Sequence, residues 1–143
     1  IKEALHLLDK LLTKEMVQLK TEFCDLYILG ISNELTQVII NLIQNSIDAF
    51  AKNSILIREI TICVTSDDEF VYITLSDNGG GIKKEFQERV FEPYFTTKHN
   101  AKGTGLGLFM SKMICEQGFN GALELYSKKN ITIFTIKIPH HEK

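Results

Sequence analysis

The chain has 143 residues, 44% hydrophobic and 24% charged, which is the balance of a globular domain and excludes a disordered chain, a collagen or a coiled coil. Its net charge of −2 offers no basic surface for phosphate backbones, so we expect no nucleic-acid binding. The longest run without a charged residue, 35–47, contains polar amides and is shorter than the roughly 18 apolar residues of a membrane span, so we expect no membrane contact by this domain.

The length fits a single domain, residues 1–143, and the chain begins with Ile1 rather than methionine, so we expect a fragment of a longer protein. Its three cysteines, Cys24, Cys63 and Cys115, are odd in number and show no C-x-x-C spacing. They are typical of reduced thiols in a cytoplasmic protein and not of a disulfide framework or a zinc site.

Taken in chain order, apolar spacing predicts an amphipathic helix over 1–12 and a helix over 33–51. A further helix begins near Leu106 and ends at Gly118 as its C′ residue. Alternating apolar residues or short apolar runs predict strands around 17–23, 26–29, 60–64, 71–75, 123–126 and 131–138. This order predicts an α+β fold, a two-layer sandwich with one largely antiparallel sheet and helices on one face.

Polar side chains gather on one face of the predicted helix 33–51. At about 100° per residue, Asn41, Asn45 and Asp48 fall within a wedge of roughly 60°. Such a stripe is usually just a solvated face, but a solvated face normally carries Lys and Glu, and Asn is a poorer helix former. Because amide oxygens bind hard cations, the stripe also fits a Mg²⁺ site shared with substrate phosphates.

Two glycine-rich segments add further chemistry. Residues 77–81, DNGGG, follow a predicted strand and fit either a tight turn or a bare backbone beside a carboxylate that accepts from an exocyclic amine. Residues 102–108, KGTGLGL, lead into a helix whose free N–H groups can bind phosphate, although a flexible hinge has the same pattern. The second segment is neither a P-loop nor a Rossmann fingerprint.

At these residues the sequence resembles the catalytic, ATP-binding domain of sensor histidine kinases, in the GHKL superfamily. Residues 41–49, NLIQNSIDA, resemble its N box, and 77–82, DNGGGI, its G1 box. Residues 91–98, FEPYFTTK, resemble its F box, and 103–108, GTGLGL, its G2 box. The resemblance covers nearly the whole chain and implies the Bergerat-type α/β sandwich, with ATP held between the N-box helix and a mobile lid.

The resemblance also implies ATP and Mg²⁺ as cofactors and roles for single residues. Asn45 would ligate Mg²⁺, Asn41 would position the phosphates, and Lys98 would help to neutralise the triphosphate. Asp77 would accept a hydrogen bond from the adenine amino group. The other nucleotide-binding residues implied are Asp48, Ala49, Gly79, Gly81, Ile82, Phe95, Thr97, Gly103, Thr104, Gly105, Leu106, Gly107, Leu108 and Thr132.

Two positions depart from the family pattern. Residues 129–131, KNI, stand where glycines usually precede the last-box threonine, so this box is degenerate. Asp48 occupies a position where many kinases carry a basic residue near the phosphates. Charge compensation then falls to Lys98, with Lys102 nearby in the sequence.

The position four residues before the metal-binding Asn decides between two reactions. ATP-hydrolysing relatives carry a glutamate there that resembles a base, whereas this chain carries Asn41, and an amide cannot act as a base. Glu34 lies nearly two helical turns from Asn41. The sequence therefore favours phosphoryl transfer to histidine, which needs mainly positioning and electrostatic stabilisation. A non-catalytic nucleotide-binding or docking module and a GHKL ATPase are the alternatives.

The histidines of the chain, His6, His99, His140 and His141, are interpreted as structural or incidental. We therefore expect the phosphoacceptor before Ile1, on a helical dimerisation domain of the same kinase, with a response regulator downstream. The irregular stretch 82–103, with one short helix over 84–90, is typical of a functional lid. Its tail has almost no apolar residue, so we expect bound nucleotide to order 96–105.

Overall fold

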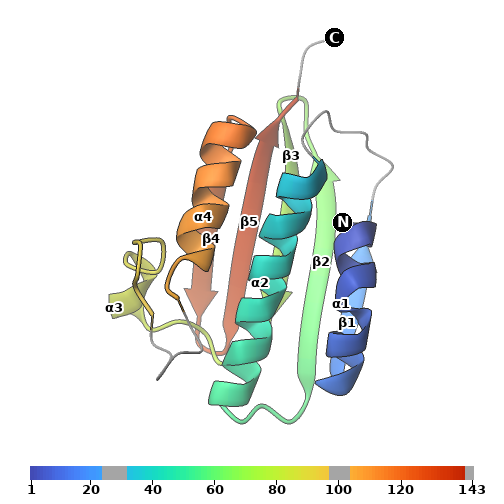
Figure 1. Cartoon of the computed structure of the whole chain (residues 1–143), viewed down its shortest axis with the longest axis vertical. Coiled ribbons are helices and arrows are strands. Elements are labelled where there is room, and N and C mark those ends of the chain that lie inside the picture. The colour runs from blue at the N-terminus through green and yellow to red at the C-terminus, as the bar shows by residue number, and fades with distance from the viewer. Residues whose placement is uncertain (24–31, 97–103, 141–143) are drawn as a thin grey trace.

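The computed structural model describes residues 1–23, 32–96 and 104–140 of the chain. Figure 1 shows the elements in their arrangement. In chain order they are α1 (Lys2–Lys14), β1 (Val17–Glu22), α2 (Ser32–Lys52), β2 (Arg58–Ser66), β3 (Phe70–Asp77), α3 (Lys84–Gln87), α4 (Gly107–Met113), the π-helical turn η2 (Ile114–Gly118), β4 (Ala122–Lys128) and β5 (Ile131–Pro139).

The five strands form one sheet in the order β1-β2-β3-β5-β4. β1 pairs with β2 in parallel, and every other neighbouring pair is antiparallel. The connection from β1 to β2 passes through α2, as a parallel pair requires a crossover, whereas short turns join β2 to β3 and β4 to β5. The prediction of a largely antiparallel sheet is confirmed.

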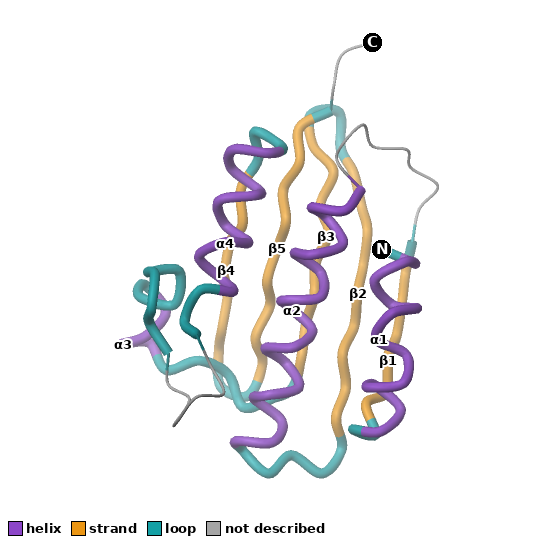
Figure 2. Tube along the Cα trace, viewed as in Figure 1, coloured by secondary structure: helices purple, strands orange, loops and turns teal. Residues whose placement is uncertain are grey.

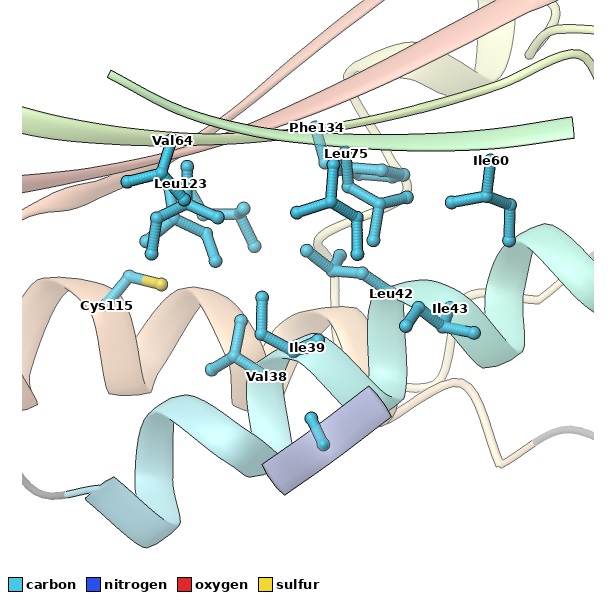
Figure 3. Close-up of a cluster of buried hydrophobic side chains, with 14 of the residues drawn as sticks. Val38, Ile39, Leu42, Ile43, Ile60, Val64, Leu75, Cys115, Leu123 and Phe134 are labelled. Carbon is cyan, nitrogen blue, oxygen red and sulfur yellow. The ribbon is translucent and has the colours of Figure 1, made fainter. Parts of the chain in front are cut away.

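The helices α1, α2 and α4 cover one face of this sheet, as Figures 1 and 2 show. Strand residues alternate between buried and half-buried, so each central strand turns an apolar row toward the helices. Figure 3 shows the two layers meeting, with side chains of α2 facing those of the strands. The fully buried residues include Val38, Ile39, Leu42, Ile43, Ile60, Leu75 and Ile136. This apolar burial is the main force that fixes α2 across the sheet.

The helix after the glycine-rich segment ends differently from its prediction. α4 passes into the π-helical turn η2, and the left-handed residue that follows is Asn120, with φ 53°. The prediction of Gly118 as a C′ residue is therefore wrong. Gly118 lies inside η2, where a Cβ would be 2.7 Å from Oε2 of Glu34 on α2, so this glycine allows a close helix contact instead.

The remaining differences are small. α1 runs two residues further than predicted, to Lys14, and α3 is shorter than the predicted helix over 84–90. The predicted strand over 26–29 lies outside the described residues. Within the three described ranges, no helix is both long and apolar enough to cross a membrane.

Candidate functional site

Asp77 is the last residue of β3, the central strand of the sheet. Its neighbours across the sheet are Ile60 on β2 and Thr132 on β5. The alternation of β3 turns the side chain toward the helices, so that Asp77 is only 5% exposed. A carboxylate thus occupies an inward position where the period of the strand calls for an apolar residue.

Both carboxylate oxygens of Asp77 accept hydrogen bonds from the protein. The backbone N–H of Gly79 donates to Oδ1 at 2.9 Å, and the hydroxyl of Ser46 on α2 donates to Oδ2 at 2.6 Å. Burial raises the pKa of Asp77, and the bonds from Ser46 and Gly79 oppose that rise. Since two carboxylate oxygens offer about four acceptor positions, Asp77 can still accept from a bound ligand.

The glycine loop, residues 78–81, leaves the sheet directly after Asp77. Gly80 and Gly81 have φ of 107° and 71°, a region that other residues rarely adopt. A Cβ on Gly81 would collide with the carbonyl of Lys129. On the other side, Nδ2 of Asn53 donates to the carbonyl of Gly79 at 2.6 Å. Contacts within the protein therefore fix the backbone of the glycine loop.

Ile82 ties the end of this loop to the β4–β5 hairpin. Its N–H donates to Oγ of Ser127 at 2.7 Å, and that hydroxyl donates to the carbonyl of Ile131 at 3.0 Å. Nε2 of Gln87 donates to the Ile82 carbonyl at 2.9 Å. The buried Thr132, whose Oγ1 lies 3.5 Å from Ser127 Oγ, sits beside Asp77 in the sheet. The structure thus brings together the predicted residues Asp77, Gly79, Gly81, Ile82 and Thr132.

Asn41 joins α2 to the first turn of α4. Its Nδ2 donates to Oγ of Ser111 at 3.1 Å and lies 3.5 Å from the carbonyl of Gly107. Its Oδ1 accepts from Nε2 of Gln37 at 3.1 Å. The predicted stripe on α2 is therefore not merely a solvated face, because Asn41 belongs to a contact between two helices.

The other predicted residues of α2 follow toward the glycine loop. Asn45, one turn after Asn41, is half-buried, and its side chain makes no hydrogen bond to another residue of the described chain. Oδ1 of Asp48 accepts from Nε2 of Gln44 at 3.2 Å on the exposed side. Cβ of Ala49 lies 3.0 Å from the position of a Cβ on Gly79, so α2 packs directly on the loop.

The segment before α4 has some of its backbone groups bonded, whereas the first N–H groups of α4 itself have no intrahelical partner. The N–H of Leu106 donates to Oγ1 of Thr104 at 3.3 Å, and the carbonyl of Gly105 accepts from Tyr94 at 2.8 Å. Gly107 begins α4, which has no side-chain N-cap, and among the described residues no atom beyond its chain neighbours and the helix backbone lies within 4 Å of where its Cβ would be. Leu108 packs against the core. The described part of the predicted phosphate-binding segment therefore offers free donors beside open space.

Apart from the short helix α3, residues 82–96 have no regular secondary structure, as predicted, and side-chain contacts link them. The rings of Phe86 and Phe95 lie 5.6 Å apart, and the guanidinium of Arg89 lies 4.7 Å from the Phe95 ring. The predicted site residues Thr97, Lys98 and Gly103 lie outside the described residues.

Sequence reasoning missed several residues that hold this site together, namely Ser46, Asn53, Ser111 and Ser127. Ser46 carried a signal, because it lies on the buried face of the helix between Leu42 and Phe50. A polar group at such a position requires a hydrogen-bond partner. The partner itself, Asp77, is 31 residues away along the chain.

The donor set restricts the metal that this site could hold. Within the described ranges, no group of three or more His, Cys, Asp or Glu side chains could hold a metal ion. A cation would therefore depend on amide oxygens, such as that of Asn45, and on oxygens of the ligand. Those donors fit Mg²⁺, which commonly shares its coordination with substrate phosphates, and do not fit zinc.

A sequence profile of the histidine kinase-, DNA gyrase B- and HSP90-like ATPases matches residues 30–142. The chain belongs to this ATPase family. Within it, the chain is 36% identical over 113 residues to the two-component sensor PprA of Pseudomonas aeruginosa, and 40% identical over 108 residues to the sensor histidine kinase ZraS of Salmonella typhi. These matches cover 77% and 75% of the chain but span only 12% and 22% of the two relatives.

Solved structures of histidine kinases share the fold of this ATPase-family domain. The catalytic domain of the histidine kinase ThkA is 30% identical and matches with a TM-score of 0.82 over 96% of this chain and 88% of that chain. A structure of ThkA in complex with the response regulator protein TrrA matches with a TM-score of 0.79 at 26% identity, over 98% of this chain and 39% of that chain. The predicted Bergerat-type fold and the resemblance to histidine kinase catalytic domains are confirmed.

Proposed function

We propose that this domain binds Mg-ATP and donates the γ-phosphoryl group to a histidine on a separate helical dimerisation domain. The observation that carries the proposal is the placement of α2, which contacts the glycine loop through Asn53 and the first turn of α4 through Asn41. About 18 Å of helix separates these two residues. One nucleotide lying along α2 would then reach an acceptor for its amine at one end and free donors for its phosphates at the other.

At the base end, Asp77 is proposed to accept from the exocyclic amino group of adenine. Gly79 leaves the backbone bare beside this carboxylate, because a Cβ there would lie 2.9 Å from Oδ1 of Asp77, and Gly81 permits the turn that follows. The flanking surface is formed by Ala49 on α2 and Thr132 on β5. Ile82 completes it at the end of the loop, where Ser127 holds its backbone.

At the phosphate end, the backbone N–H groups between Thr104 and Leu108 are proposed to bind the triphosphate, with Asn41 positioning it. Asn45 would hold Mg²⁺ through its amide oxygen, and the ion when bound would offset the charge of the phosphates. The resemblance further assigns contacts to Asp48, Phe95, Thr97, Lys98 and Gly103. We propose these as additional nucleotide contacts, with Lys98 supplying positive charge.

Transfer is proposed over hydrolysis because the described site holds no carboxylate where a base would act. Asn41 occupies the position of the base, and its amide is bonded to Ser111 and has no basic atom. Glu34, on the same helix, lies against Gly118 at the end of η2, two turns away from Asn41. The described site thus has no group to deprotonate a water molecule for hydrolysis. It can still position the γ-phosphoryl group and stabilise its charge during transfer, and transfer to a histidine needs little more than this.

The described histidines do not lie at this site. His6 is exposed on α1, and His140 contacts the carbonyl of Asp67 at the β2–β3 turn, the opposite end of β3 from Asp77. We therefore propose that the acceptor belongs to a dimerisation domain of the same kinase. A response regulator is proposed as the downstream partner, supported by the complex of ThkA with TrrA.

The decisive experiment mixes this chain with the separately produced dimerisation domain of its parent kinase and ATP labelled at the γ-phosphate. We expect acid-labile label on the acceptor domain and little release of inorganic phosphate. Asn45→Ala is expected to abolish transfer, while Asn33→Ala, an exposed position on the same helix, serves as the matched control. Release of phosphate without labelled acceptor would favour an ATPase. Binding of Mg-ATP with neither outcome would favour a non-catalytic docking module.

A further inference from the structure

Ser46 is a buried polar residue for which the proposed chemistry has no assigned role. It lies on α2 one residue after Asn45, is 1% exposed, and faces the sheet. Its hydroxyl donates to Oδ2 of Asp77 at 2.6 Å, while the carbonyl of Leu42 lies further away, at 3.3 Å. A hydroxyl has a single proton, so the shorter contact to the carboxylate is the principal bond.

In this bond the Ser46 hydroxyl is the donor, so the bond favours the ionised form of Asp77, whose oxygens only accept. Hydrogen bonds from a hydroxyl to an ionised carboxylate are typically about 2.5–2.7 Å long, shorter than those between neutral groups. Burial in the sheet acts in the opposite direction and raises the pKa of Asp77. Ser46 supplies the one side-chain bond that opposes this effect among the described residues, and Gly79 supplies a backbone bond.

No charge elsewhere takes over this role within the described ranges. β2 faces Asp77 with the apolar Ile60, β5 with the neutral Thr132, and α2 with Ser46. The nearby acidic residue of α2, Asp48, is bonded to Gln44 on the exposed side of the helix. Among the described residues, hydrogen bonding from Ser46 and Gly79 is what opposes protonation of the carboxyl group.

We propose that Ser46 is a positioning residue that keeps Asp77 an ionised hydrogen-bond acceptor and so sets the preference of this site for 6-amino purines. The inference rests on the proposed adenine contact of Asp77. If Asp77 loses the Ser46 bond, it takes up a proton more readily. In a protonated carboxyl group one oxygen carries a hydrogen and becomes a donor, so the group can no longer accept from an amine with both oxygens. The Gly79 N–H holds Oδ1 and the Ser46 hydroxyl holds Oδ2, so the two bonds together fix the rotation of the carboxylate plane.

The test compares Ser46→Ala, which removes the hydroxyl, with Ser46→Thr, which keeps it. In the ligand-free chain, NMR of the Asp77 side-chain carboxyl carbon follows its titration. We expect Ser46→Ala to move the midpoint upward by about one pH unit, the scale of one hydrogen bond to a charged group, and Ser46→Thr to restore it. If threonine is too large for the buried position, Ser46→Cys, a weaker donor, is expected to give an intermediate midpoint.

Calorimetry with a matched pair of nucleotides then tests specificity. Mg-ATP carries the 6-amino group, and the Mg complex of purine riboside triphosphate carries hydrogen there. Below the Asp77 midpoint of the parent chain, where a one-unit shift changes the ionised fraction up to about tenfold, we expect Ser46→Ala to weaken Mg-ATP by up to about that factor and the purine analogue less than twofold. As the pH is lowered, the affinity for Mg-ATP should also begin to fall at a higher pH in Ser46→Ala than in the parent chain.

Three outcomes would overturn the proposal. An unchanged titration of Asp77 in Ser46→Ala would show that Ser46 does not control its ionisation. Equal weakening of both nucleotides would show that Ser46 supports only the packing of α2. If the parent chain itself binds both nucleotides equally, the adenine contact of Asp77 fails, and this specificity role fails with it. The ligand-free titration separates that failure from an error about the Ser46–Asp77 bond.

Discussion

The amide of Asn41 on α2 faces the carbonyl of Gly107 at the start of α4, with Nδ2 and O 3.5 Å apart. Because a carbonyl oxygen can only accept, the NH₂ group must be the side that faces α4, and the same group donates to Ser111. The amide oxygen then points to the exposed side of α2, where Gln37 donates to it. This orientation makes Asn41 both a link between two helices and an outward-facing acceptor.

Asn41→Asp tests that orientation. The substitution replaces the NH₂ group by oxygen, which would face the Gly107 carbonyl and repel it. We expect the free energy of unfolding to fall by about 1–3 kcal/mol, the cost of leaving buried polar groups without partners, and Mg-ATP affinity to fall as well. Chemical denaturation measures the first and calorimetry the second. Gln37→Ala removes only an exposed donor and should change stability by less than about 0.5 kcal/mol. Equal stability of Asn41→Asp and the parent chain would contradict the assigned orientation.

Asn45→Ala is expected to separate metal binding from folding. The side chain of Asn45 has no hydrogen-bond partner within the described residues, so its removal should leave thermal stability nearly unchanged. Affinity for Mg-ATP should fall roughly tenfold or more, whereas affinity for ATP in excess chelator should change little. Calorimetry with and without Mg²⁺ measures both, with Asn33→Ala as the control. A similar loss under both conditions would argue against a metal ligand at this position.

The parts of the fold that were predictable follow from burial. α2 and β3 each bury one face, and burial imposes periods of 3.6 and 2 that can be counted along the sequence. The end of α4 was not predictable in this way, because the same apolar residues suit an α-helix and the wider π-helical turn over Ile114–Gly118. A tertiary contact also falls on this turn, since Oε2 of Glu34 lies 2.7 Å from where a Cβ of Gly118 would be, and such a contact cannot be counted along the sequence.

Some residues of the candidate site could be identified from the sequence and others could not. Asn41, Asn45 and Asp77 were identifiable because each is a residue type that regular structure does not need at its position. Ser46 and Ser127 were not, since their importance lies in partners far along the chain, Asp77 and Ile82. Serine is common on helices and strands, so Ser127 had no local signal. The buried face on which Ser46 lies indicated that it needs a hydrogen-bond partner, but not which one.

Asp77→Asn is expected to stabilise the fold at neutral pH while weakening nucleotide binding. Burial raises the pKa of Asp77 above its unfolded value of 3.8. Between these two pKa values the unfolded chain binds fewer protons than the folded chain, so the free energy of unfolding falls as pH rises. The ionised carboxylate of Asp77 therefore lowers the stability of the fold by its full amount above the pKa of the folded state, and has no such effect well below pH 3.8.

Thermal unfolding across acid and neutral pH therefore measures the effect. The melting temperature of Asp77→Asn should exceed that of the parent chain at pH 7, and the difference should shrink as the pH falls toward 4. Preference for ATP over GTP should decrease in the variant, because an amide can donate as well as accept. A variant that is less stable at pH 7 and keeps the nucleotide preference would identify Asp77 as a purely structural residue.

Gly81→Ala is expected to disrupt the glycine loop. Its φ of 71° disfavours alanine, and the added Cβ would collide with the carbonyl of Lys129. Together these effects should cost about 2–4 kcal/mol of stability. Denaturant unfolding measures the loss. Unchanged stability would show that the β4–β5 turn can move aside, and that the loop is less fixed than its contacts indicate.

Gly107→Ala provides the opposite case, a glycine whose role is in binding and not in folding. Gly107 begins α4, and alanine there would meet no obstacle among the described residues, since none of them beyond the chain neighbours and the helix backbone lies within 4 Å of the added Cβ. Alanine is a better helix former than glycine, so stability without ligand should rise by up to about 1 kcal/mol. The added methyl group would nevertheless stand beside the N–H groups proposed to bind phosphate, and Mg-ATP affinity should fall roughly tenfold, with adenosine affinity unchanged. Thermal unfolding and calorimetry with both ligands check this pairing of gain and loss. Full Mg-ATP affinity in a stabilised variant would place the triphosphate away from the start of α4.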